Sequence, residues 1–239
     1  MRDQPLERPA RGSYLRELRA IKDLAVMPTY LSLSHLGRSR RTRKASPVLL
    51  IPGFGGGDRV MAPFRKYLED AGYPCFGWEM GTNLAGLNQR YDDSQLTWDF
   101  DRSRVNNGEY GVPYLCDRMT ARAQQISEDA GSPIAIIGWS LGGCSAREVA
   151  RDAPEHVEQV ITLGTPVKGG PKYTAVADRL TKRGLDLDWI ETEVNNRDAN
   201  PISRPITAIV SKGDGVVGYE ASIDRVSPNV THVDVSVAH

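Results

Sequence analysis

The stretch that decides the fold reads IAIIGWSLGG and runs from Ile134 to Gly143. Its first four residues are all apolar and predict a strand buried on both faces, as in a parallel sheet. The residues from Leu141 to Arg151 predict a helix, so Ser140 stands in a sharp turn from strand to helix. Gly138 and Gly142 leave room for such a turn. The G-x-S-x-G string is common by chance, and this setting is what makes Ser140 a candidate nucleophile.

Strands and helices alternate on both sides of this turn. This order is typical of a mostly parallel sheet with helices on both faces, and we predict the α/β class. We expect a helical and basic extension over 1–46, one α/β domain over 47–239, and a small helical cap insertion over 166–205. The other expected strands are 48–51, 73–78, 157–163, 206–210 and 231–235, with helices over 59–71 and 113–130 and an irregular stretch over 81–112.

The composition is that of an ordinary globular protein, with 40% apolar and 25% charged residues in 239. Thirty basic and thirty acidic side chains balance, so no overall field favours nucleic acid. Cys75, Cys116 and Cys144 show neither metal-ligand spacing nor a disulfide framework, which indicates a reduced compartment. No secretory signal or membrane span is visible, so we expect a cytoplasmic location.

The extension over 1–46 leaves two alternatives open. Its apolar residues have helical spacing up to Ala25, and its polar face is basic. It could pack on the main domain as an appendage, or lie peripherally on a membrane surface. We interpret the basic run from Arg38 to Lys44 as a solvated linker, with binding to a phosphate-rich surface as the alternative.

A serine hydroxyl needs a base, and the base needs an orienting acid. His232 stands near the start of the last expected strand, whereas His239 lies past its end, about 20 Å further along. Sites in open α/β sheets form at the carboxyl ends of strands, so His239 is the predicted base. Asp214 follows another strand end between two glycines and is the predicted acid. The alternative for Asp214 is a turn residue without chemistry.

Acyl transfer also needs N–H donors for a developing oxyanion. We expect one from Leu141 and the other from Phe54, which lies in the glycine-rich loop after the first core strand. Gly53, Gly55 and Trp139 are expected to contact substrate. A phosphate-binding role for this loop is disfavoured because the Lys-Ser/Thr of a P-loop is missing.

From Val48 to its end the chain resembles bacterial α/β-hydrolases of the lipase and carboxylesterase type. The resemblance implies ester hydrolysis through an acyl-enzyme on Ser140, a small-molecule or lipid ester as substrate, and no metal or organic cofactor. Ser140, Asp214 and His239 also follow the chain order of this fold. The motifs that carry the resemblance are LIPGF at 50–54, GWSLGG at 138–143, ITLGTP at 161–166 and SKGDGVV at 211–217.

Two departures from the family pattern stand out. Pro52 replaces a histidine common in lipases, which leaves the backbone donor in place. The family usually continues past its catalytic histidine into a final helix, whereas this sequence ends at His239. Either the sequence is a fragment, or another contact anchors that residue. Two functional alternatives remain: an acyltransferase with the same triad, and a non-catalytic binding protein that keeps the fold.

Overall fold

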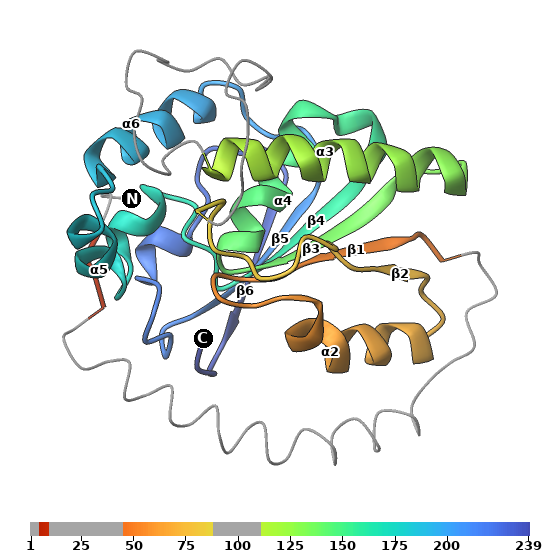
Figure 1. Ribbon diagram of the computed structural model, residues 1–239, viewed down its shortest axis with the longest axis horizontal. Coiled ribbons are helices and arrows are strands. Elements are labelled where there is room, and N and C mark those ends of the chain that lie inside the picture. The colour runs from red at the N-terminus through yellow and green to blue at the C-terminus, as the bar shows by residue number, and fades with distance from the viewer. Residues whose placement is uncertain (1–4, 10–44, 88–110) are drawn as a thin grey trace.

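The computed structural model describes residues 5–9, 45–87 and 111–239 (Figure 1). Among these residues six strands form one sheet in the order β2-β1-β3-β4-β5-β6, and every neighbouring pair is parallel. The predicted parallel sheet is therefore confirmed. The strands are β1 (Val48–Ile51), β2 (Cys75–Phe76), β3 (Ile134–Trp139), β4 (Val157–Leu163), β5 (Ile206–Ser211) and β6 (Val230–Val235).

Helices cover both faces of this sheet, as Figure 1 shows. Helix α2 (Asp58–Asp70) lies on one face, and α3 (Gly111–Ala130) and α4 (Leu141–Asp152) lie on the other. Successive side chains of a strand point to opposite faces. Alternate residues of β1 accordingly join two different core clusters, Leu49 with the α3 and α4 side and Leu50 with the α2 side. This is why β1 and β3 are apolar at nearly every position.

The chain between β4 and β5 forms a small helical layer beside the carboxyl ends of the strands. It contains η5 (Gly170–Tyr173), α5 (Ala177–Lys182) and α6 (Leu187–Asp198). Asp186 caps α6, because its carboxylate accepts the N–H groups of Asp188 and Trp189.

An ion-pair cluster joins α6 to α4 through Glu148, Arg151, Asp152, Arg197 and Asp198. Short η4 (Pro154–His156) and η6 (Glu220–Ser222) complete the described elements.

The expected strands and helices agree with the structure to within two residues at each end, except for one strand that was too long. The strand expected over 73–78 pairs only at Cys75–Phe76, because the N–H groups of Trp78 and Glu79 donate to the Asp58 carboxylate and turn the chain away from β1. The helix expected from residue 113 begins at Gly111. The helical pattern expected before Ala25 and the basic run from Arg38 to Lys44 lie outside the described residues, as does most of the 81–112 stretch.

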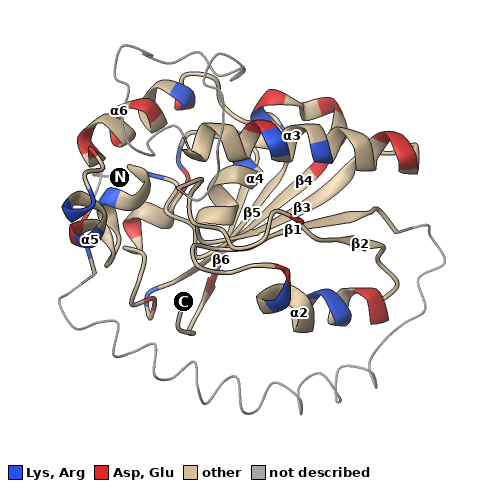
Figure 2. Ribbon diagram, viewed as in Figure 1, with Lys and Arg blue, Asp and Glu red and all other residues tan. Residues whose placement is uncertain are grey.

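Charged side chains gather on the helices, whereas the strands are mostly uncharged (Figure 2). In the described ranges no helix combines the length and apolar character needed to cross a bilayer. Cys75, Cys116 and Cys144 are all free thiols.

Candidate active site

Ser140 occupies a strained turn between β3 and α4. Its backbone φ of 52° and ψ of −119° lie in a region that residues with a side chain rarely adopt. The turn is held from both sides, since Ser140 N–H donates to Leu163 O at 2.8 Å and Gly143 N–H donates to Ser140 O at 2.9 Å. Strain of this kind persists only where the surrounding structure fixes it, and it often marks a functional position.

Glycines make this turn possible because backbone atoms pass too close for a side chain. A Cβ on Gly138 would lie 2.3 Å from Gly142 O. A Cβ on Gly142 would lie 2.3 Å from Ile51 O and 2.6 Å from Pro52 O. The end of β1 therefore presses directly against the start of α4.

We expect Gly142→Ala to unfold the turn or displace β1 from α4. Ile51 O and Pro52 O are backbone atoms and cannot move away without moving the chain, so the variant should lose more than about 2 kcal/mol of stability. Thermal unfolding measures this loss of stability. Gly131→Ala is the matched control: it lies at a left-handed φ of 65° with no atom within 4 Å of its Cβ, so it should lose only about 1 kcal/mol. Equal losses in the two variants would contradict the close packing described here.

Asp214 and His239 are brought together at the carboxyl ends of β5 and β6. Asp214 Oδ2 lies 2.8 Å from His239 Nδ1, and the two side chains are 4% and 8% exposed. The other carboxylate oxygen, Oδ1, accepts the N–H groups of Val216 and Val217, each at 2.8 Å. A buried carboxylate so satisfied can hold the imidazole with its proton on Nδ1, which makes Nε2 the ring nitrogen that can accept a proton.

The last residues are tied to the sheet by Ser211, a residue that the sequence argument missed. Its hydroxyl donates to Val237 O at 2.5 Å and accepts Gly213 N–H at 3.0 Å. The rings of His239 and Trp139 also lie against each other, with centroids 5.7 Å apart. Asp214 and the Trp139 ring thus hold the His239 side chain, and the bond from Ser211 to Val237 O holds the backbone just before it. Ser211 begins the motif at 211–217, but its bond to Val237 O depends on the register of β5 against β6.

The loop after β1 meets the Ser140 turn because β1 and β3 are neighbours in the sheet. Ile51 pairs with Gly138, and a Cβ on Gly53 would lie 3.1 Å from the Ser140 Cβ. The chain order reverses between these two strands, which is where open α/β sheets place their ligands. Leu141 is the first residue of α4, so its N–H has no partner within the helix.

A cavity of about 350 Å³ opens beside these groups and is lined by Ser140, His239, Phe54 and Leu141. That size is typical of a small-molecule site. Gly53 and Trp139 also line it, whereas Gly55, although described, does not. Its apolar wall comes largely from the layer between β4 and β5 and includes Val167, Pro171, Val176, Leu180, Leu185 and Trp189.

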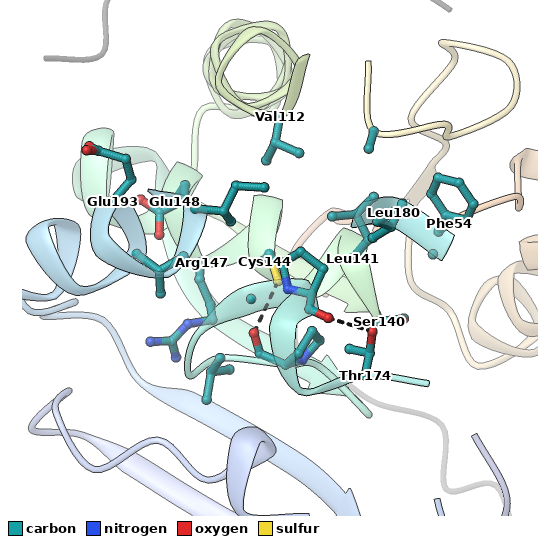
Figure 3. A pocket seen from close by; sticks show the side chains of 18 of the residues that line it. Phe54, Val112, Ser140, Leu141, Cys144, Arg147, Glu148, Thr174, Leu180 and Glu193 are labelled. Carbon is teal, nitrogen blue, oxygen red and sulfur yellow. Dashed lines mark hydrogen bonds between the residues drawn. The ribbon is translucent and has the colours of Figure 1, made fainter. Parts of the chain in front are cut away.

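The cavity follows one face of α4 away from Ser140. Leu141 and Cys144 line its first part, and Arg147 and Glu148 line the far part at the same helical spacing. Figure 3 shows Phe54 and Ser140 toward one end of the pocket and Arg147 and Glu148 toward the other. The cavity is therefore apolar next to Ser140 and bounded by charged groups about 10 Å further along the helix.

The geometry can be compared with known proteins. No family model matches the sequence. A curated relative, the pimeloyl-[acyl-carrier protein] methyl ester esterase of Klebsiella pneumoniae (strain 342), is 27% identical over 150 residues. That match covers 52% of this chain and 57% of the relative, so the chain matches little more than half of that protein's length.

Solved structures similar to this one include two lipases. The mature form of the Bacillus licheniformis lipase BlEst2 matches with a TM-score of 0.53 at 13% identity, over 84% of this chain and 86% of that structure. The Paleococcus ferrophilus monoacylglycerol lipase matches with a TM-score of 0.51 at 13% identity, over 82% and 88%. At such low identity these matches describe the fold alone.

Proposed function

Because this chain has the α/β-hydrolase fold, we propose that it is a serine hydrolase that cleaves carboxylic esters through an acyl-enzyme on Ser140. The observation that carries the proposal is that Ser140 and His239 line one cavity while Asp214 holds His239 Nδ1 at 2.8 Å. Three side chains from three strand ends thus supply a candidate nucleophile, a candidate base and a candidate orienting acid, which supports the proposal.

In the first half of the reaction Ser140 Oγ attacks the ester carbonyl carbon. His239 Nε2 takes the hydroxyl proton, and the Asp214 carboxylate stabilises the imidazolium that forms. The carbonyl oxygen becomes an oxyanion, which the N–H groups of Leu141 and Phe54 would hold. When the tetrahedral intermediate collapses, His239 returns the proton to the leaving alcohol and the acyl group stays on Ser140.

In the second half water replaces the alcohol. His239 removes a proton from water, the hydroxide attacks the acyl carbonyl, and the same donors hold the second oxyanion. Collapse releases the carboxylic acid and returns the proton to Ser140. No step needs a metal or an organic cofactor.

The proposed substrate is a small-molecule or lipid ester with an apolar acyl group. The apolar part of the cavity beside Ser140 supports this choice, and the cap that we propose over 166–205 would supply most of its wall. The charged groups at Arg147 and Glu148 would limit the length of acyl chain that can be buried.

Hydrolysis of p-nitrophenyl esters of graded acyl length tests the proposal. We expect kcat/KM to rise with acyl length until the apolar part is filled and then to stop rising. Cys144→Phe should displace at least two methylenes, each worth about 0.8 kcal/mol, and so lower kcat/KM for the best long ester about tenfold. The acetate ester should change less than about twofold, because it does not reach that far.

Cys144→Ala is the matched control, since it changes the same side chain without adding bulk. It should keep or lengthen the preferred acyl chain. An unchanged length profile in Cys144→Phe would place the acyl group elsewhere, and a wild-type protein that hydrolyses none of the esters would refute the proposed function.

A further inference from the structure

Asn83 is a buried residue, 1% exposed, that lies against the glycine-rich loop after β1. Its backbone pairs with that loop in both directions: Gly55 N–H donates to Asn83 O at 2.7 Å, and Asn83 N–H donates to Gly56 O at 2.8 Å. Its side-chain amide donates to Pro52 O at 2.8 Å and accepts Ala85 N–H at 3.2 Å. Three of its four hydrogen bonds therefore hold the segment that carries Phe54.

These bonds determine where the Phe54 N–H points. In a planar trans peptide the N–H and the C=O point in opposite directions. Gly53 O accepts Gly56 N–H at 3.0 Å, so the Phe54 N–H of the same peptide unit is directed away from the interior of the loop. Asn83 fixes the peptide units on both sides, through Pro52 O before Phe54 and Gly55 N–H after it.

We propose that Asn83 is a positioning residue that aims the Phe54 N–H at the oxyanion of the acyl-transfer reaction. This inference rests on the function proposed above and names a residue that the sequence argument did not. The hydrogen bonds of Asn83 would keep the loop that carries Phe54 in one conformation. An oxyanion donor lowers the barrier only if its N–H already points to where the charge develops.

The position requires an amide. One end of the Asn83 side chain must donate to a carbonyl, and the other must accept an N–H. A carboxylate of the same shape would set a negative oxygen against Pro52 O, and both would repel. The Pro52 carbonyl has little freedom to yield toward the nucleophile turn, since it lies only 2.6 Å from where a Cβ on Gly142 would stand.

Asn83→Asp should therefore lower kcat for a p-nitrophenyl ester by about 10- to 100-fold, somewhat less than complete removal of an oxyanion donor costs. KM should change less than about twofold, because the acyl cavity does not include Asn83. The ratio of variant to wild-type kcat should rise as the pH falls, since a protonated carboxyl in the variant regains a donor for Pro52 O.

A trifluoromethyl ketone that carries the same acyl chain as the best ester tests the role directly. It binds as a tetrahedral adduct with an oxyanion, whereas the matching alcohol forms no oxyanion. We expect Asn83→Asp to weaken ketone binding by the same factor as kcat and to leave alcohol binding unchanged. Asn229→Asp is the matched control: exposed Asn229 makes the same amide-to-carbonyl bond, to Ser203 O at 3.0 Å, stands just before β6 at the end of the strand opposite to His239, and does not line the cavity.

Thermal unfolding shows whether each variant is folded. If Asn83→Asp does not fold, Asn83→Gln replaces it. This variant keeps the amide one methylene further from the backbone, and its binding of the ketone is compared with its binding of the alcohol in the same way. Ketone binding within twofold of wild type, or equal weakening of ketone and alcohol, would overturn the positioning role while leaving the hydrolase intact. A wild-type protein that neither cleaves the ester nor binds the ketone would overturn both.

Discussion

Ser140→Ala should lower kcat/KM for a short-chain p-nitrophenyl ester by a factor on the order of 10⁴ to 10⁶. The substitution removes the only atom that would attack the carbonyl, while the oxyanion donors and the acyl cavity remain. Initial rates at high enzyme concentration measure the residual activity. Stability should hardly change, because alanine keeps the Cβ and the Ser140 side chain makes no capping hydrogen bond to α4.

Ser145→Ala is a suitable control for this experiment, since Ser145 is a buried serine on the same helix. It should keep most of the wild-type rate. If Ser140→Ala kept more than a few per cent of the rate while folded, Ser140 would not be the nucleophile and the mechanism above would be wrong.

Asp214→Asn should lower kcat by about 10⁴-fold with the fold intact. The amide oxygen can still accept the N–H groups of Val216 and Val217, so its NH₂ group must face His239 Nδ1. That donor forces the His239 proton onto Nε2, the atom that has to accept the serine proton. The substitution should thus keep the contact with His239 but lose the correct imidazole tautomer. Steady-state kinetics measure the loss of kcat, and thermal unfolding shows that the fold is kept.

Asp234→Asn is the matched control for Asp214→Asn. Asp234 lies on β6 and accepts the Tyr219 hydroxyl at 2.6 Å at the surface. It should cost less than about twofold in kcat. A folded Asp214→Asn variant with near wild-type activity would show that Asp214 is a turn residue without chemistry.

The parallel sheet and the candidate nucleophile could be predicted because the residues that indicate them are neighbours in sequence. The apolar run of β3, the glycines of the Ser140 turn and the following helix stand next to one another in sequence. Asp214 and His239 could be chosen because strand ends share one edge of a parallel sheet. His232 could be set aside on the same ground, and in the structure it stands exposed on β6, where its Nε2 accepts Asp224 N–H.

The rest depends on contacts between distant segments, which no pattern in one sequence reports. Asn83 reads as an ordinary loop residue until its amide is seen against Pro52 O, 31 residues earlier. Ser211 holds the last residues only because β5 and β6 pair in one register. The strand expected over 73–78 was too long for a related reason, since the Asp58 carboxylate accepts the N–H groups of Trp78 and of Glu79, the residue after it.

The central claim is that the acyl group passes through a covalent ester on Ser140. Rapid acid quench of the wild-type protein with a p-nitrophenyl ester, followed by mass spectrometry of its peptides, tests this most directly. We expect one acyl group per chain on the peptide that contains Ser140, and none in the Ser140→Ala variant. An acyl group on Cys144 instead, which also lines the cavity, or turnover with no acyl-enzyme at any time point, would contradict it.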